Sequence, residues 1–470
     1  MNHLIRQHYL HISLHGTEVE GMALQRQLSD LWQHRLLPAI EPVFDRYAQP
    51  DEHIVISYME VDAGTVSLAG LEQELAGQVR QAIEQSLRAE PSTEQTDPTK
   101  PSAIGARKTH LQSIEEALLY FLKTGSLPWA FQLPDGKTLE QCSLEVWQTT
   151  SIPNGQLTIS VPALQAALRS ETARKRLIWH FSPLFLATLL HRISPAANGV
   201  VVAIRHGLAN APVAATDDSL YVEQYIWEAA FALVATGTQL TDAHLLRSAW
   251  QAIPDTAPKK KSVAALLDQR WPGITQNRAD DEPPISAVTG PIHKNPAEAD
   301  EWIDIEDGLF IDNAGLVLLH PFLPRFFDGL GLLVNTEIQH PERALCLLYF
   351  LATGQGEVPE YSLQLPKILC NIPLETPVNT KVVLTDAETG EAIALLEAVI
   401  RHWDVLKNAS VDALRNEFLM RPGKLSHRRD GDWQLQLEGR SVDVLLDNLP
   451  WGISMIQLLW MERMLRVEWR

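Results

Sequence analysis

The feature that most constrains the fold of this 470-residue chain is an octapeptide that occurs twice. LLYFLKTG occupies residues 118–125, LLYFLATG occupies residues 347–354, and seven of the eight positions are identical. After each copy come a proline, an aromatic residue, Gln-Leu-Pro and a cysteine: Pro128, Trp129, 132–134 and Cys142, then Pro359, Tyr361, 364–366 and Cys370. The likeness therefore extends beyond a chance helical fragment.

Each copy predicts a buried helix with a defined end. A nearly unbroken run of Leu, Tyr and Phe is typical of a helix buried on most of its circumference. Thr-Gly predicts the stop, because glycine accepts the left-handed geometry that ends helices, here at Gly125 and Gly354. Neither copy contains a nucleophile with a base, a phosphate-binding glycine loop or spaced metal ligands. The chain has duplicated a packing unit rather than an active site.

Size and charge limit the class of protein. At roughly 150 residues per domain the length suggests three domains, and 45% hydrophobic residues are enough for ample cores. A net charge of -19 argues against a nucleic-acid partner, because binding to phosphate depends on Lys and Arg. Three cysteines are too few for a disulfide framework or a zinc site.

Neither a signal peptide nor a membrane span is expected. Residues 1–16 lack an apolar h-region, so we expect synthesis in the cytoplasm. The longest apolar stretch, residues 315–333, contains Pro321, Pro324, Arg325 and Asp328, and charges at bilayer depth are costly. We therefore interpret it as a core segment.

Periodicity divides the chain into three units. Residues 1–90 predict a strand-helix-strand-helix unit, with strands at 6–15 and 53–62 and helices at 18–47, bent near Pro38, and 71–87. Residues 91–108 and 272–300 are rich in proline and polar residues and predict linkers. Residues 109–271 form a helical middle unit with the first copy. A predicted helix over 222–236 in it runs into ALVATG (232–237), a weak third copy.

Residues 301–470 form the C-terminal unit with the second copy. We expect a strand near 308–311, helices over 315–330, 342–352 and 391–407, and a hairpin around Leu425 and 433–437. The predicted fold class is α+β, predominantly helical and multidomain: a small N-terminal α/β unit and two helix-rich units related by the repeat.

No catalytic site is predicted. The G-x-S-x-G, G-x-G-x-x-G and Walker A patterns are absent from the sequence. His180 and Ser182 lie close in WHFS (179–182), but side chains this close in sequence on a helix point apart. An enzyme without a recognisable motif stays a third-ranked alternative.

No metal or cofactor site is predicted either. His3, His8, His11 and His15 crowd the N-terminus, yet no carboxylate or cysteine completes a ligand set. The acidic run 298–307 lacks the spacing of an EF-hand loop.

One family resemblance is specific. NAGLVLLHPFLPRFF (313–327) resembles the NAGLVLLxPFLPxxF signature of the contractile injection system tape measure family, with His320 where an aromatic residue is expected. LPKILCNIP (365–373), EAVIRHWDVL (397–406) and LPWGIS (449–454) extend it, and MEVDAG (59–64) is similar to the LeLDlG near the family's start. We take eight residues as motif residues. Two are the repeat glycines, Gly125 and Gly354, and six are signature positions: Asn313, Gly315, Pro321, Pro324, Trp451 and Gly452.

The resemblance implies a non-enzymatic component of phage-tail-like particles that bacteria assemble to puncture target cells. Such a protein sets tube length or nucleates the tube, and its implied partners are inner-tube, baseplate or hub proteins and cargo. The alternative is a cytoplasmic chaperone for tail or cargo proteins. At 1.5 Å per residue the chain would reach about 700 Å only as one helix, which 29 prolines exclude. We therefore expect a globular soluble form, incorporated into the particle or active before assembly.

Overall fold

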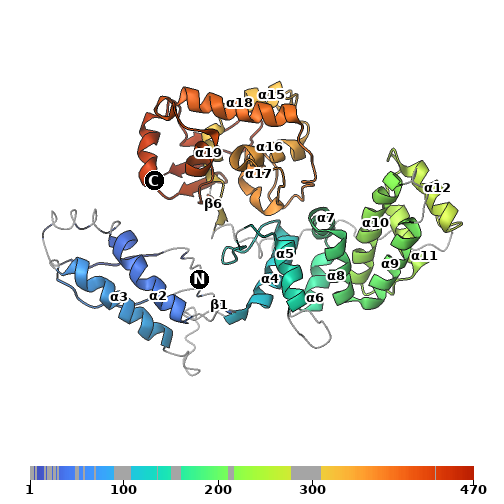
Figure 1. The fold of residues 1–470 in the computed structure, drawn as a ribbon, viewed down its shortest axis with the longest axis horizontal. Helices are drawn as coiled ribbons and strands as arrows, with labels where there is room; N and C mark the ends of the chain where they lie inside the picture. The colour runs from blue at the N-terminus through green and yellow to red at the C-terminus, as the bar shows by residue number, and fades with distance from the viewer. Residues whose placement is uncertain are drawn as a thin grey trace. The chain divides into compact units, whose positions relative to one another are not determined.

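The computed structural model describes most of the chain in two compact units, 1–114 and 115–470. The described residues are 5, 8–14, 17, 24, 28, 31–47, 52–54, 56, 59–67, 70–88, 107–149 without 135, 160–209, 216–276, and 308–469 without 429. Figure 1 shows a mostly helical chain with a small sheet, as the sequence predicts. Both predicted linkers lie largely outside the described residues, so the predicted domain boundaries stay predictions.

The first unit is built on two helices, α2 (Leu37–Tyr47) and α3 (Leu71–Arg88). Apolar residues at helical spacing, such as Ile40 and Val43 on α2 and Val79 and Ile83 on α3, form its core. A π-helical turn, η1 (Trp32–Leu36), precedes α2. Pro38 is the second residue of α2 and has no N–H to donate, which accounts for the irregularity predicted near it.

The strands predicted for the first unit are wrong in extent. The described residues 8–14 form no strand, and the His8 ring instead stacks on Trp32 with centroids 3.8 Å apart. The second predicted strand shrinks to β1 (Glu52–Ile54), which pairs with β2 (Arg107–Thr109) in an antiparallel ribbon. Alternation alone could not show which segment supplies the partner strand, and an unpaired strand leaves its backbone groups unsatisfied.

Nine described helices follow from residue 110 to residue 270, so this segment is helical as predicted, and its status as a separate unit stays a prediction. They are α4 (His110–Thr124), α5 (Leu139–Thr149), α6 (Val161–Leu168), α7 (Glu171–His180), α8 (Pro183–Ile193), α9 (Pro195–Ala209), α10 (Thr216–Ala235), α11 (Asp242–Ala252) and α12 (Lys260–Arg270). Helix α10 contacts α6, α7, α9, α11 and α12, and its residues 229–235 are all buried. It is thus the central helix of this region.

The C-terminal part combines short helices with one sheet. Its sheet has the order β3-β6-β7-β9-β8, with β7 and β9 parallel and the other neighbours antiparallel. The strands are β3 (Leu309–Ile311), β6 (Gly423–His427), β7 (Trp433–Leu437), β8 (Met455–Ile456) and β9 (Leu465–Trp469), with a separate ribbon of β4 (Leu333–Val334) and β5 (Glu337–Ile338).

Around the sheet lie ten described helices. They are η4 (Ala314–Leu319), α15 (Leu323–Gly329), α16 (Pro341–Thr353), η5 (Glu360–Ser362), α17 (Gln364–Leu369), α18 (Asp386–His402), η6 (Asp404–Leu406), α19 (Val411–Leu414), η7 (Arg415–Leu419) and η8 (Ser441–Asn448). Of these, η4, α15, α16, α18 and η6 fall where helices were predicted, with different bounds, and the other five were not predicted. Helix α18 starts earlier than predicted because Thr385 and Glu388 form a capping box. Strands β8 and β9 were not predicted.

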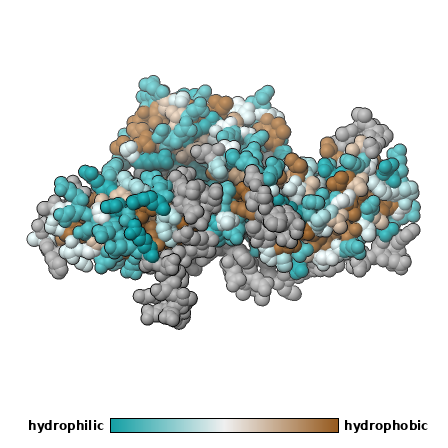
Figure 2. All heavy atoms as spheres, turned by 60° about the horizontal axis from the view of Figure 1, so that its bottom comes forward, coloured by the Kyte–Doolittle hydropathy of each residue, from teal (hydrophilic) through white to brown (hydrophobic). Residues whose placement is uncertain are grey.

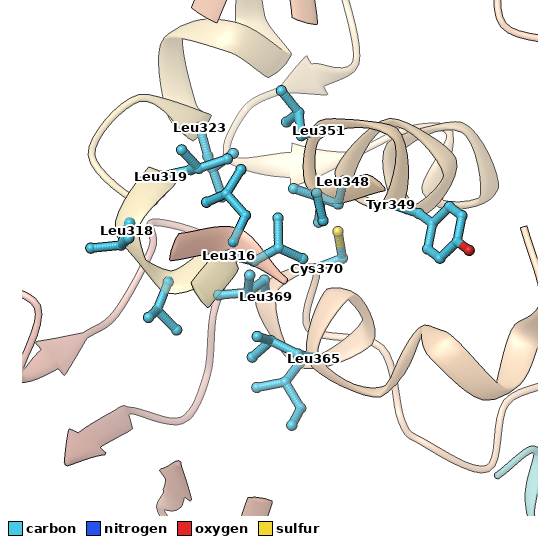
Figure 3. Close-up of a cluster of buried hydrophobic side chains, with 14 of the residues drawn as sticks. Leu316, Leu318, Leu319, Leu323, Leu348, Tyr349, Leu351, Leu365, Leu369 and Cys370 are labelled. Carbon is cyan, nitrogen blue, oxygen red and sulfur yellow. The ribbon is translucent and has the colours of Figure 1, made fainter. Parts of the chain in front are cut away.

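Within the described residues no helix is both long enough and apolar enough to cross a membrane. The apolar stretch interpreted as core is η4 and α15. All six residues of η4 are buried. Figure 3 shows Leu316, Leu319 and Leu323 lying against Leu348 and Leu351 of α16.

Candidate functional site

The two repeat copies end in the same geometry. Helices α4 and α16 stop at Gly125 and Gly354, with φ of 77° and 74°, and each glycine N–H donates to the phenylalanine carbonyl four residues earlier at 2.8 Å. The threonine before each glycine bonds back to the tyrosine carbonyl, at 2.9 Å for Thr124 and 2.8 Å for Thr353. The capped-helix prediction is confirmed for both copies.

At each end an arginine from another element donates to the last carbonyls of the helix. Arg176 of α7 reaches the oxygens of Leu122 and Lys123 at 3.1 and 3.0 Å. Arg415 of η7 reaches those of Leu351 and Phe350 at 3.1 and 3.3 Å. A cation is favourable there, because the free carbonyls form the negative end of the helix dipole.

The weak third copy shares part of this arrangement. Gly237, just after α10, has a φ of 73°, and Thr236 Oγ1 donates to Leu233 O at 2.9 Å. Arg169 Nε donates to Ala235 O at 3.4 Å. Three Thr-Gly helix ends therefore have an arginine cap.

Of these three helix ends only that of α4, in the first copy, is buried. The segment that follows the second copy covers it. Glu360 of η5 accepts from Arg176 Nε at 3.2 Å and from Lys367 Nζ at 2.7 Å, both at Oε1. Lys367 Nζ also donates to the carbonyls of Leu374 and Thr376, at 3.0 and 2.8 Å. Gln364 Nε2 lies 3.3 Å from Ser126 Oγ. We call Arg176, His180, Glu360 and Lys367 the charged junction.

The side chains of the charged junction are almost completely buried. The side chains of Arg176 and Glu360 have no exposed area, Lys367 has 2% and His180 has 9%. His180 Nε2 lies 3.0 Å from Glu360 Oε2. Arg176 and Lys367 are two cations around the one carboxylate of Glu360, and both also donate to backbone carbonyls.

The ionisation states follow from these contacts. Burial alone would raise the pKa of Glu360, but the close approach of His180 and the charges of Lys367 and Arg176 lower it to about 2. Burial lowers the pKa of Lys367, and the neighbouring Glu360 carboxylate opposes that effect. All three N–H groups of Lys367 have acceptors, so the amine is held as a structural cation.

Sequence reasoning missed this junction. It identified Pro359, Tyr361 and 364–366 as an extension of the repeat without seeing that Glu360 and Lys367 act within that segment. The available signal was the spacing of Arg176 and His180, which puts them on one face of α7. The likeness of the copies also ends here, since Gln364 starts α17 whereas residues 132–134 are not helical.

The signature residues lie together around η4. Asn313 Nδ2 donates to Ser362 O at 3.0 Å, which ties the start of η4 to η5. A Cβ on Gly315 would lie 1.6 Å from Phe418 O, so only glycine allows η4 to pack on η7. Trp451 Nε1 donates to Leu318 O at 3.1 Å, and its ring meets Phe322 edge-on at 5.2 Å.

The remaining signature residues have smaller roles. Pro324 stands in the first turn of α15, where its missing N–H is tolerated. Pro321 is exposed in the turn between η4 and α15. Gly452 is exposed and nothing in the structure explains its glycine. A functional role for the motif residues stays a prediction.

The candidates for chemistry are not brought together. Ser182 binds Glu140 and caps α8, whereas His180 faces Glu360. Among the described residues no three His, Cys, Asp or Glu side chains are grouped as metal ligands would be. His3, His15 and the acidic run 298–307 lie outside the described residues.

Comparison with known proteins identifies the family. A family model described as contractile injection system tape measure protein matches residues 2–469. The chain belongs to this family. Searches of curated proteins and of solved structures found no match. Membership in the tape measure family supports a structural role in a contractile injection system, with protein partners in the particle.

Proposed function

We propose that this tape measure family protein acts as a folded, non-enzymatic particle component that sets tube length or nucleates the tube. The observation that carries the proposal is the family match over residues 2–469, which includes the signature region around η4. The longest described helix, α10, has 20 residues and spans about 30 Å. A ruler made of one continuous helix would therefore require this fold to be lost first.

The surface supports binding to proteins. Figure 2 shows small groups of hydrophobic residues between hydrophilic ones on the face drawn. Several large apolar side chains are more than half exposed: Leu184, Leu220, Val383, Val444, Met455 and Leu459. Exposed apolar side chains are the usual anchors of protein interfaces. We propose inner-tube, baseplate or hub proteins as the partners, with cargo as a further candidate.

A deletion strain tests the role. Electron microscopy of particles from the strain should show altered length or failed assembly, and normal particles of normal length would refute the proposal. Mass spectrometry of purified wild-type particles should find the protein. Its absence there, together with failed assembly in the deletion strain, would favour the chaperone instead.

Small-angle scattering of the purified protein tests the folded form separately. We expect a multidomain globular profile. A rod-like or random-chain profile would contradict it, whatever the deletion strain shows.

A further inference from the structure

The two repeat helices present the same group of side chains at their ends, and we name this group a helix-end socket. The filled socket consists of Phe121, Thr124, Gly125 and Arg176. The open socket consists of the corresponding Phe350, Thr353, Gly354 and Arg415. Both have the left-handed glycine, the threonine bond and the arginine on the last carbonyls.

In the filled socket a segment of the same chain supplies three groups. The Glu360 carboxylate pairs with Arg176, the Tyr361 ring meets Phe121 edge-on at 5.9 Å, and the Gln364 amide reaches Ser126. Phe121 is 1% exposed as a result, and Thr124, Gly125 and Ser126 are buried.

The open socket has no such cover in the described chain. Phe350 and Thr353 are partly exposed, and residues 354–357 are all exposed. Arg415 lies over the Phe350 ring with Cζ 5.4 Å from its centroid. The carboxylate nearest to Arg415 is Asp412, 3.4 Å away with 83% of its own side chain exposed. In the second copy the arginine, which is 11% exposed, thus pairs with an exposed carboxylate, whereas in the first copy it pairs with the buried Glu360.

The two helices also bury different faces of the same sequence. In α4 the face carrying Phe121 and Thr124 is buried, while Leu119 and Tyr120 are partly exposed. In α16 the counterparts Leu348 and Tyr349 are buried. The Phe-Thr-Gly face of α16 is thus less buried than that of α4, although Phe350 still packs against the core and the same side chains are retained.

We propose that the open socket binds a segment of another protein that supplies a carboxylate for Arg415 and an aromatic ring for Phe350. A second copy of this chain is disfavoured as the occupant, because its own matching segment is buried in its filled socket. The proposal rests on the two sockets alone and does not depend on the tube-length role.

A peptide of residues 357–368 (EVPEYSLQLPKI), labelled with a fluorophore, is the probe, and fluorescence anisotropy with the full chain is the measurement. We expect saturable binding, weakened at least about tenfold when the peptide carries Glu360→Gln and Tyr361→Ala. Equal binding of the two peptides, or no binding by about 1 mM, would overturn the proposal.

Chain variants then locate the site. Arg415→Met should weaken binding at least about tenfold, whereas Arg401→Met, an exposed arginine on α18, should leave it unchanged. Because Arg415→Met also removes a helix cap, Asp412→Ala serves as a second test. It frees Arg415 and should tighten binding, and unchanged or weaker binding would count against the site.

Cross-linking separates the open socket from displacement of the resident segment. A peptide with benzoylphenylalanine in place of Tyr361 should cross-link to α16 or η7. Cross-links confined to α4 or α7 would mean that the peptide displaces Glu360 in the filled socket, and would refute the proposal.

Discussion

Arg176 and Glu360 are 184 residues apart in the chain and pair with no exposed side-chain area. The pair joins the end of the first repeat helix to the segment that follows the second copy. A buried pair adds little net stability over an apolar contact, but loss of one partner leaves an uncompensated charge. The junction therefore makes the contact between these segments specific.

Replacing Glu360 by Gln should destabilise residues 115–470 strongly. Arg176 and Lys367 would stay buried without their anion, and broken buried pairs of this kind cost roughly 3 to 5 kcal/mol. The measurement is the urea midpoint by circular dichroism. Glu397→Gln, at a 56% exposed position paired only along α18, is the matched control and should have no more than a small effect. Similar midpoints for the two variants would contradict the role of the junction.

Acid should weaken the fold through the same residue. In the folded chain the pKa of Glu360 is lowered from 4.5 to about 2. As the pH drops, the unfolded chain therefore takes up this proton at a higher pH than the folded chain does. The carboxylate contributes about 3 kcal/mol above about pH 5, and this is lost as the pH falls through 2. The lowered pKa of Lys367 has the opposite sign: it disfavours the folded state at low pH, and this cost is relieved as the pH rises through the pKa of the folded chain.

Urea midpoints between about pH 5 and pH 2 measure this acid loss. The Glu360→Gln variant should show a shallower pH dependence than the wild type over that range. Parallel curves for the two proteins would mean that Glu360 is not the titrating group.

Gly125→Ala should destabilise the protein more than the same substitution at a left-handed glycine that has no neighbouring atoms. Its Cβ would lie 2.8 Å from Glu360 Oε1 and about as close to Arg176, inside the buried junction. Gly136 has a φ of 71° with no atom within 4 Å and is the matched control. We expect about 1 kcal/mol for Gly136→Ala from backbone strain alone, and at least about 1 kcal/mol more for Gly125→Ala. Equal losses in thermal unfolding would argue against close packing at Gly125.

Gly315→Ala should prevent normal packing of η4. Its Cβ would fall 1.6 Å from Phe418 O, a backbone atom that cannot rotate away. We expect a loss above about 3 kcal/mol or failure to fold. Gly329→Ala at the end of α15, where nothing lies within 4 Å, should be tolerated. A soluble Gly315→Ala protein with wild-type melting would show that η4 can move away from η7.

Much of the fold follows from local chemistry. The capped ends of α4 and α16 were predictable because Thr-Gly after a leucine-rich run specifies them, and the β6–β7 hairpin follows from alternation around Leu425 and Leu435. The strand expected at 6–15 fails because alternation does not specify a pairing partner. The β7–β9 pairing is parallel and joins distant segments, which local patterns do not encode.

The charged junction could not be predicted for a related reason. Glu360 and Lys367 look like ordinary surface residues in a polar segment, since charged side chains are rarely buried without partners. The partners of Glu360 on α7, Arg176 and His180, are distant in sequence, and only the tertiary fold brings them together. The two copies of one octapeptide also bury different faces, so sequence identity did not reveal which end would be covered.

Strand β9 lies between β7 and β8, although it is the last of the five in sequence. During synthesis, β3, β6 and β7 can pair as soon as they leave the ribosome, but β8 has no neighbour until Leu465–Trp469 follow. Trp469 Nε1 also donates to Asp443, which binds Arg421, so η8 waits for the same strand. The β8–β9 part of the sheet can therefore form only after translation has passed β9, and we expect chains truncated before Leu465 to leave the β7 edge unpaired and to be prone to aggregation.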